Sequence, residues 1–533
     1  MTLAQLGITN CYYIAANGSD SNDGASEASG HPWLHAPGMT GASGSAAAHT
    51  PAAGDGYIFR GGDTWNQSNF TWQFPYSGTA ANPIYIGVDQ GWYSGGSWMR
   101  PIFDLGLTAS WGVPHAYAFL GNNYLIIDNI EGKGLYETAS FHPNFFGVGV
   151  YSRYENLYFH GWGHDSTFIT WINGGAGCAN NSGPGSCQSS IQMMTAPQYF
   201  NGGAQTKQGT VARYNVVDGS DTDKYQALAF GHPSSPPTLY GNVVRYVTVG
   251  VSGTFDVAHD NLFEYYSDCG GNGCGHQDDL YQQCGTGFTN TMLIYNNVIR
   301  HHSVPWEGGA VKLWLSGNCG NAGRTGYAFN NLLYDNWPGN IVDIGSHYGN
   351  TDYGTWNFFN NTIACQLDSG TGVGCMLGDN LLWAGVTGSS LTLNLMNNHW
   401  IGQSGSPLSC GTKPGNHYTC TEQNDLEQTI AQANSQGYSS TSRYAFQPTS
   451  TSHAGISTQS LCNIIGGVDS LAGAACQNDF TYACNYDAVN HVVVCPAKVT
   501  AVRGTVPNIG AYQFNGTQAS TLEPPLGLTA VIQ

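Results

Sequence analysis

The chain repeats one short motif through its middle, an Asn followed by an apolar run. The clearest copies begin at Asn261, Asn297, Asn331, Asn361 and Asn398, so the spacing varies between 30 and 37 residues. Fainter copies begin at Asn129, Asn156, Asn215 and Asn242. A repeat of variable length predicts a solenoid whose turns carry loops of different size on one side, and that side is usually where binding occurs.

Each repeat joins a short β-rich run to polar or Gly-rich stretches, and no long segment keeps an apolar period of 3.6 residues. This pattern predicts stacked strands and an all-β fold. An Asn side chain can bond the local backbone and tolerates a left-handed conformation, which suits a turn. Repeated at one place in successive coils, these side chains would stack into a ladder. The alternative is that they are turn residues only.

Composition agrees with a large, loop-rich β protein from an oxidising compartment. The 533 residues include 73 Gly, 9% charged residues and 41% hydrophobic residues. The 15 Cys show no CxxC pair or zinc pattern, so we expect disulfides, and their connectivity stays open. The cysteines that lie close in sequence are Cys178 with Cys187, Cys269 with Cys274, Cys365 with Cys375, Cys410 with Cys420, and Cys484 with Cys495. The odd count leaves at least one thiol unpaired within the chain.

Neither a signal peptide nor a membrane-spanning run is visible, and a leader could have been removed. The net charge of −19 makes nucleic acid and an anionic membrane poor partners. It also disfavours strongly anionic polysaccharides unless metal ions intervene. The 14 Trp and 31 Tyr would suit stacking on sugar rings, and the alternative is that they stack inside the solenoid.

Three N-terminal stretches carry a resemblance to a known group. They are YYIAANGSDSNDG from Tyr12, HPWLHAPG from His31 and AAGDGYIFRGGDTW from Ala52. Together they resemble the opening cap of secreted bacterial right-handed parallel β-helix proteins, a group with many polysaccharide lyases and glycoside hydrolases. VPNIGAYQF from Val506 similarly resembles the closing strand of such chains.

The resemblance implies a right-handed parallel β-helix and a polysaccharide substrate, but it does not supply a reaction, because one fold hosts several chemistries. A pectin-hydrolase pattern would need Asn-Thr-Asp, Asp-Asp, Gly-His-Gly and Arg-Ile-Lys in order. The chain offers Asp278 and Asp279 but lacks the last two motifs. We therefore do not transfer that mechanism.

We expect one domain with three parts. Residues 1–97 form an N-terminal cap with the first strands, including a Gly/Ala/Ser-rich insertion over 38–54. Residues 98–404 form the β-helix coils with loop insertions, and 405–533 form an irregular Cys-rich segment that closes the same domain. In that last part NDLEQTIAQAN, from Asn424, predicts a helix.

Candidate catalytic groups follow from aligning consecutive coils by distance from the Asn. In this alignment Leu280, Leu313 and Ile344 share an inward column, because strand side chains alternate between faces. Asp279, Lys312 and Asp343 share an outward column, with Tyr281 and Trp314 in a second outward column beside it. A slip of one residue would bury the charges instead.

This arrangement would suit an inverting glycoside hydrolase. Two strand steps put the backbones of Asp279 and Asp343 about 9–10 Å apart. Side-chain tilt could bring the carboxyls into the roughly 6.5–9.5 Å range of inverting enzymes, where one protonates the leaving oxygen and the other activates water. Lys312 would hold a hydroxyl or keep one carboxylate ionised, while Tyr281 or Trp314 stacks on a ring. The alternative is a structural charge ladder.

A Ca²⁺-dependent polysaccharide lyase makes a different demand. Lys312 would be the base, and Asp278, Asp279 and Asp343 would hold Ca²⁺, which keeps the lysine from staying protonated. The segment that follows the repeat Asn supplies further proton carriers or substrate contacts. These are Arg300, His301, His302, Trp306 and Glu307, with His276 and His259 as additional candidates.

Two other groups of charged residues have structural explanations. Arg245, Glu264 and Arg300 share one offset from their Asn, and we interpret Arg245 and Glu264 as a structural ion ladder. The stretch around Asp20 could bind Ca²⁺, but an Asp/Asn/Gly turn is the account we favour.

We therefore expect a secreted enzyme that hydrolyses a neutral or weakly charged polysaccharide and needs no cofactor. The alternatives are a Ca²⁺-dependent lyase with Lys312 as base, and a non-catalytic glycan-binding or surface-structural protein. The sequence leaves open the sugar, its linkage, any metal and the oligomeric state.

Overall fold

The computed structural model describes most of the cap and all strands of the solenoid, with gaps in the loops. The described ranges are 2–70, 72–108, 122–138, 143–147, 149–167, 191–195, 209–223, 227–230, 238–253, 255–265, 279–282, 291–302, 313–315, 324–336, 340–344, 353–365, 376–378, 390–402, 418–436, 453–480, 484–495 and 500–513.

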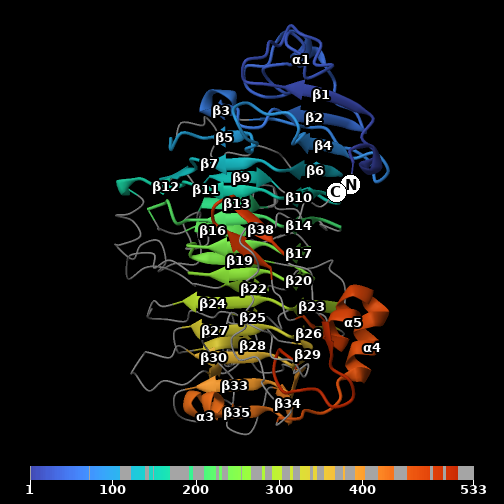
Figure 1. Ribbon diagram of the computed structural model, residues 1–533, viewed down its shortest axis with the longest axis vertical. Helices are drawn as coiled ribbons and strands as arrows, with labels where there is room; N and C mark the ends of the chain where they lie inside the picture. The colour runs from blue at the N-terminus through green and yellow to red at the C-terminus, as the bar shows by residue number, and fades with distance from the viewer. Residues whose placement is uncertain are drawn as a thin grey trace.

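Three long parallel sheets make up the molecule (Figure 1). Sheet 1 consists of β1 (Asn10–Ile14), β2 (Asp55–Phe59), β4 (Ile84–Gly87), β6 (Leu125–Asp128), β10 (Arg153–Glu155), β14 (Val211–Arg213), β17 (Thr238–Tyr240), β20 (Val257–His259), β23 (Thr291–Tyr295), β26 (Thr325–Phe329), β29 (Tyr353–Phe359), β32 (Ser390–Met396) and β34 (Tyr418–Gln423).

Sheet 2 consists of β3 (Thr64–Asn66), β5 (Ile102–Asp104), β7 (Glu131–Lys133), β11 (Tyr158–His160), β15 (Val216–Asp218), β18 (Val243–Arg245), β21 (Leu262–Glu264), β24 (Val298–His302), β27 (Leu332–Asn336), β30 (Thr362–Cys365), β33 (His399–Gly402) and β35 (Leu426–Thr429). Sheet 3 consists of β9 (Asn144–Gly147), β13 (Ile191–Thr195), β16 (Ala227–Phe230), β19 (Val249–Gly253), β22 (Leu280–Gln282), β25 (Leu313–Leu315), β28 (Asn340–Ile344) and β31 (Met376–Gly378).

Through the middle of the chain, each coil contributes one strand to sheet 1, one to sheet 2 and one to sheet 3, in that order. The predicted all-β, right-handed parallel β-helix is therefore confirmed. Sheet 1 already begins in the predicted cap, at β1. Sheets 1 and 2 continue to β34 and β35, beyond residue 404, where we expected the coils to end.

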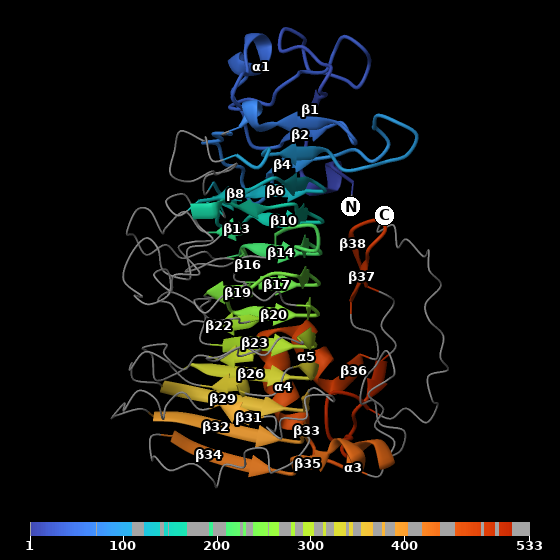
Figure 2. The ribbon, with the colours of Figure 1, turned by 90° about the vertical axis from the view of Figure 1, so that its left-hand side faces the viewer.

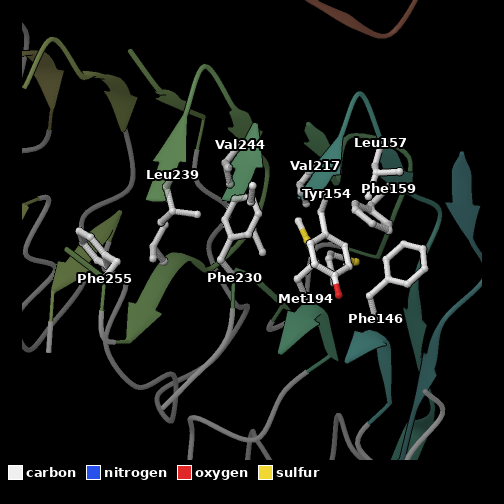
Figure 3. Close-up of a cluster of buried hydrophobic side chains, with 14 of the residues drawn as sticks. Phe146, Tyr154, Leu157, Phe159, Met194, Val217, Phe230, Leu239, Val244 and Phe255 are labelled. Atoms are coloured by element: carbon white, nitrogen blue, oxygen red, sulfur yellow. The ribbon is translucent and has the colours of Figure 1, made fainter. Parts of the chain in front are cut away.

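The core is a column of inward side chains from all three sheets (Figure 3). Phe146 of sheet 3, Tyr154 of sheet 1 and Phe159 of sheet 2 meet there, with ring centroids 6.0 and 5.8 Å from that of Phe146. Aromatic and branched residues pack well on a pleated surface, so the same residues that favour strands also fill the space between the sheets.

The corner between sheets 1 and 2 contains the predicted ladder. Each turn consists of one residue with positive φ followed by an Asn, and each Asn accepts from the backbone N–H and side-chain amide of the Asn in the preceding coil. The stacked members are Asn215, Asn242, Asn261, Asn297, Asn331, Asn361 and Asn398, and Asp425 ends the column.

Asn129 and Asn156 are not members of the ladder, so the prediction was wrong for two of the fainter copies of the repeat. Both have φ of 57° and occupy the left-handed position, while Ile130 and Leu157 take the ladder position after them. Asn is suited to either place, because it tolerates the left-handed region and also bonds through its amide. The ladder therefore starts where the Leu157 N–H donates to Asn215 Oδ1, at 3.0 Å.

On the outer face of sheet 2, the predicted ion ladder is confirmed. Arg245 pairs with Glu264 in register, and Glu264 with Arg300. Arg300 Nε lies 2.9 Å from Glu264 Oε2, and Arg245 Nε lies 3.8 Å from Glu264 Oε1. In the cap, Asp20 accepts hydrogen bonds from His35 and Ser43, which fixes the turn that we favoured there.

The short elements are the 3-10 helices η1 (Ala4–Leu6) and η2 (Gln67–Asn69), the helices α1 (Gly44–Ala48), α3 (Ile430–Ser435), α4 (Gln459–Val468) and α5 (Ser470–Gln477), the parallel pair β8 (Tyr136–Glu137) and β12 (Gly163–His164), and the antiparallel pairs β36 (Asn478–Phe480) with β39 (Thr500–Val502) and β37 (Asn485–Asp487) with β38 (Val492–Val494).

The C-terminal part differs from prediction in two places. The expected helix at Asn424 begins only at Ile430, because Leu426–Thr429 first completes sheet 2 as β35. The segment 506–513 forms an isolated antiparallel bridge, Ala454 with Asn508, and no closing strand. It packs on the outer face of sheet 2 instead, where Ala511 N donates to Thr362 Oγ1.

The C-terminal segment runs back along the outside of the coils (Figure 2). Helices α4 and α5 cover the outer face of sheet 1 around Tyr295 and Phe329. The hairpin β37–β38 lies on sheet 2, where the Tyr486 hydroxyl donates to Asp218 and the His491 ring stacks on Tyr158.

Disulfides hold this segment together. Cys462 is bonded to Cys476, and Cys484 to Cys495, one of the pairs that lie close in sequence. Cys420 is also in a disulfide, and among the cysteines of the described ranges Cys11 carries a free thiol.

Candidate active site

The corner between sheets 2 and 3, called here the 2/3 corner, contains buried charged residues. In three coils nearer the N-terminus, those of β7, β11 and β18, the residue after the sheet 2 strand has positive φ and the next side chain enters the core. Leu135, Trp162 and Val247 occupy that inward place and are all buried. In the coil of β24 the positive-φ residue is His301, and His302 takes the inward place with 2% exposure.

The partner of His302 also replaces an apolar residue. In sheet 3 the positions equivalent to Asp279 are Phe145, Met193 and Ala229, which lie in the core, and Gly250 in the coil directly before it. Asp279 is fully buried, and its Oδ2 lies 3.4 Å from His302 Nε2. We call Asp279 and His302 the corner pair. Two predicted catalytic residues from different sheets are thus in contact.

A buried acid–imidazole pair is costly in places that several earlier coils fill with apolar side chains, because both groups lose hydration. Such a departure from an otherwise apolar column is more informative than exposed polar residues are. Buried titratable pairs also concentrate at active sites. The corner pair is therefore the centre of the candidate site.

The predicted register in sheet 3 is correct between β22 and β25 and wrong between β25 and β28. Leu280 pairs with Leu313, and Tyr281 with Trp314. Leu313 then pairs with Val342, not Ile344, so Asp343 follows Trp314 in the column. The prediction assumed that every sheet 3 strand lies the same number of residues after the repeat Asn. It failed because the connection before β28 is shorter than the connection before β25.

This correction changes the predicted carboxylate pair. Asp343 lies in register with Tyr281, two strands further along sheet 3, and Tyr281, in β22, is two residues after Asp279. The two backbones are therefore about 12 Å apart, instead of the 9–10 Å expected. Tyr281, Trp314 and Asp343 form one column of register partners directly beside the corner pair.

Arg300 and His301 have partners in the structure. Arg300 Nη1 donates to the Tyr334 hydroxyl at 3.0 Å, and its Nε donates to Glu264. Burial alone would lower the pKa of Arg300, but Tyr334 and Glu264 outweigh it, so its charge is retained. His301 Nδ1 lies 2.6 Å from Asp335 Oδ2. Arg300 is thus part of the ion ladder, whereas His301 lies at the outer edge of the 2/3 corner.

Several predicted residues lie outside the described ranges or are described by backbone alone. The first group is Asp278, Lys312, His276, Glu307 and Trp306; the second is Tyr281, Trp314 and Asp343. His259 belongs to sheet 1, where its ring stacks between Tyr240 and Tyr295, so it is a structural residue.

Sequence reasoning missed a second acid–His cluster at the 2/3 corner, which we call the corner triad. His164 Nε2 lies 3.0 Å from Glu137 Oε2, and His164 Nδ1 lies 2.9 Å from Asp223 Oδ1. The side chains of Glu137 and His164 are fully buried. Burial alone would lower the pKa of His164, but its bonds to Asp223 and Glu137 raise it to about 9.

A matching cluster lies one strand earlier in the chain. His160 bridges Glu131, at 3.1 Å, and Asp221, at 2.6 Å, and these contacts overcome burial to raise its pKa to about 9. The signal in the sequence was HGWGH, with two histidines four residues apart, followed by the Asp-Thr-Asp at Asp221.

Many aromatic residues are used in packing. Of the tryptophans in the described ranges, those buried are Trp33, Trp65, Trp72, Trp92, Trp162, Trp356 and Trp400. A stack of rings also runs along sheet 1 from Tyr240 to Phe359. This lowers the weight of aromatic content as an argument for sugar binding.

Within the described residues, no group of three or more His, Cys, Asp or Glu side chains is arranged to hold a metal ion. No helix in the described ranges is both long and apolar enough to cross a membrane.

The chain matches no protein family and no curated protein sequence. Among solved structures, it is similar to a GH136 lacto-N-biosidase from Eubacterium ramulus, with 13% identity over 79% of this chain and 68% of that one and a TM-score of 0.42. A rhamnogalacturonan lyase (13% identity, 78% and 87% covered) and a pectate lyase (16%, 79% and 80%) each give a TM-score of 0.34. The assignment of the fold therefore rests on the strand pairing of this chain.

Proposed function

We propose that this protein is an extracellular carbohydrate-active enzyme that hydrolyses a glycosidic bond at the 2/3 corner. The observation that carries the proposal is the corner pair, in which Asp279 and His302 stand where several earlier coils have apolar core residues. A carboxyl and an imidazole in contact can exchange a proton, which general acid–base catalysis requires. In this proposal Asp279 and His302 together take part in proton transfer.

Asp343 supplies the second carboxyl. It shares a column with Tyr281 and Trp314 next to the corner pair. The two backbones are about 12 Å apart, and an inverting mechanism needs the two carboxyl groups roughly 6.5–9.5 Å apart. One carboxyl would protonate the leaving oxygen and the other would activate water, with an aromatic ring of the column against the sugar.

The net charge of −19 favours a neutral or weakly charged glycan as substrate, because a polyuronate would be repelled. The disulfides Cys462–Cys476 and Cys484–Cys495 support an oxidising, extracellular setting.

The test is to incubate the purified protein with neutral and acidic polysaccharides, with and without EDTA, and to record reducing ends and ultraviolet absorbance together. We expect reducing ends without absorbance, insensitive to EDTA. Asp279→Asn and Asp343→Asn should each lower kcat by at least a hundredfold, the scale of a general acid–base group.

The matched controls are Asp23→Asn and His31→Gln, which alter an exposed Asp–His pair in the cap and should leave activity unchanged. Absorbance that EDTA abolishes would support the Ca²⁺-dependent lyase with Lys312 as base instead. No product from any polysaccharide would support a non-catalytic glycan-binding protein.

A further inference from the structure

A row of polar and aromatic residues runs along the outer edge of the 2/3 corner, directly before the inward place of His302. Its members are Tyr246, Tyr265, His301 and Asp335, one from each of four successive coils. We call this row the corner rail. Their φ angles are 52°, 55°, 62° and 51°.

Left-handed φ is uncommon for the two tyrosines, whereas His and Asp adopt it more readily. Left-handed φ suits Gly, and a bulky residue there is strained, by an amount on the order of 1 kcal/mol. Two coils nearer the N-terminus have glycines of positive φ at the same place, Gly134 and Gly161. The change from Gly to large polar residues occurs in the coils around the corner pair, and strain retained at one place in a fold often marks a functional site.

The rail presents hydrogen-bonding groups to solvent. The rings of Tyr246 and Tyr265 stack at 5.4 Å, and those of Tyr265 and His301 at 5.0 Å. Because the flat faces are turned toward one another, they are not a platform for a sugar ring. Tyr265 is 37% exposed, and the side chains of His301 and Asp335 are 28% and 40% exposed. A phenol, an imidazole and a carboxylate are thus spaced one coil apart.

We propose that the corner rail binds a neutral glycan chain that runs along the helix axis, with one sugar unit at each coil. Successive strands are about 4.8 Å apart, close to the length of one pyranose unit in an extended chain. The phenol and imidazole can donate to sugar hydroxyls, and the carboxylate can accept from them. This subsite rests on the proposed function, since it leads the chain toward the corner pair.

The matched control lies at another corner of the molecule. Tyr124 and Tyr151 also have positive φ, 57° and 54°, and stack at 5.0 Å, and Tyr151 is 43% exposed. They precede β6 and β10, at the entry to sheet 1. Replacing either Tyr151 or Tyr265 by Gly relieves the same backbone strain, so neither variant should lose the fold.

The experiment is affinity gel electrophoresis with soluble xylan, galactomannan, mixed-linkage β-glucan or pectin in the gel, in an Asp279→Asn background that prevents turnover. We expect Tyr265→Gly to weaken binding of a neutral polysaccharide by about fivefold, the value of one hydrogen bond. Tyr151→Gly should bind as the parent does. Tyr265→Phe should weaken binding as much as Tyr265→Gly, since the phenol makes the contact.

Equal binding by Tyr265→Gly and Tyr151→Gly would overturn the rail, as would the absence of binding to every neutral polysaccharide. The two proposals fail separately. Hydrolysis by the wild type with KM unchanged in Tyr265→Gly would refute the rail and leave the enzyme intact. Binding that depends on Tyr265, without product from the wild type, would refute hydrolysis and leave the rail.

Discussion

The two corners on either side of sheet 2 solve the same folding problem differently. Between sheets 1 and 2, the turn has constant length and its Asn side chains bond only to one another and to the backbone. Between sheets 2 and 3, the connection varies in length, and the corner pair and corner triad bring acids and imidazoles into the core. The ladder at the first corner repeats its hydrogen bonds from coil to coil, whereas the second corner departs from the apolar pattern in individual coils.

This contrast indicates where the fold tolerates change. In a solenoid each coil contacts only its neighbours, so one invariant corner can keep the stack in register while another accepts insertions. Chemistry is then expected at the corner that the stack does not need for its own alignment. The predictions that follow test whether the first corner supports stability and the second supports function.

The largest effect is expected from breaking the ladder. Asn331 Oδ1 accepts from the N–H and amide of Asn297, and its Nδ2 donates to Ile294 O and Asn361 Oδ1. Asn331→Leu would leave the Asn297 N–H, one amide hydrogen of Asn297 and Ile294 O without their present partner, so we expect a loss of about 5 kcal/mol in the free energy of unfolding. Denaturant titration measures it, with the exposed Asn17→Leu as control. A loss below about 1 kcal/mol would show that the ladder is not needed for stability.

The corner pair should behave differently. Asp279→Ala alone removes the ion pair with His302 in the core and should cost about 3–5 kcal/mol. Asp279→Ala with His302→Leu restores the apolar character of both columns, so the double variant should be more stable than the single one while remaining inactive. Thermal unfolding together with the hydrolysis assay measures both. A double variant less stable than Asp279→Ala would mean that His302 is needed for structure.

The sequence was sufficient for the regular corner and insufficient for the variable one. The ladder from Asn261 to Asn398 and the ion column around Glu264 were predicted, because their members keep a fixed offset from the repeat Asn. Asp343 was misplaced because the connection into sheet 3 has no such offset. Asp279 and His302 were each proposed, but their contact was not predicted, because it joins two neighbouring coils and depends on how these coils stack.

The corner triad was missed for a related reason. Glu137, His164 and Asp223 come from three coils, and each is 27 or more residues from the next. Nothing in the spacing of single residues shows that they meet. The sequence did show two closely spaced pairs, His160 with His164 and Asp221 with Asp223. These residues come together only because the coils stack.

Asp425 gives the ladder a pH dependence. Burial raises its pKa to about 7, against the bonds from Trp400 and Asn398 that lower it. Because the folded state holds the proton more tightly than the unfolded one, this contribution is complete below about pH 4 and is lost as pH rises to 7. The predicted loss in unfolding free energy is about 4 kcal/mol.

Asp425→Asn alone would face its amide toward Trp400 Nε1, which now donates to Asp425 Oδ2 at 3.0 Å. We therefore combine it with Trp400→Phe. The double variant should lose the slope between pH 4 and 7 in denaturant titrations, whereas Trp400→Phe alone should keep it. A slope that persists in the double variant would assign it to another group.

The corner triad should lose stability at alkaline pH, and the expected loss in the free energy of unfolding is smaller than the loss predicted for Asp425. His164 has a pKa of about 9, above its ordinary value of 6.5, so its contribution is complete below pH 6.5 and is lost as pH rises through 9. We expect a loss of about 3 kcal/mol from this group. His160 titrates over the same range, so His164→Gln should remove only part of the alkaline slope, and His164→Gln with His160→Gln nearly all of it. Denaturant titrations at pH 6 and pH 9.5 measure this, with the exposed His31→Gln as control. If the double variant kept the wild-type slope, the triad would not be the alkaline limit of stability, and the contrast between a neutral, hydrogen-bonded corner and a charged one would lose its thermodynamic basis.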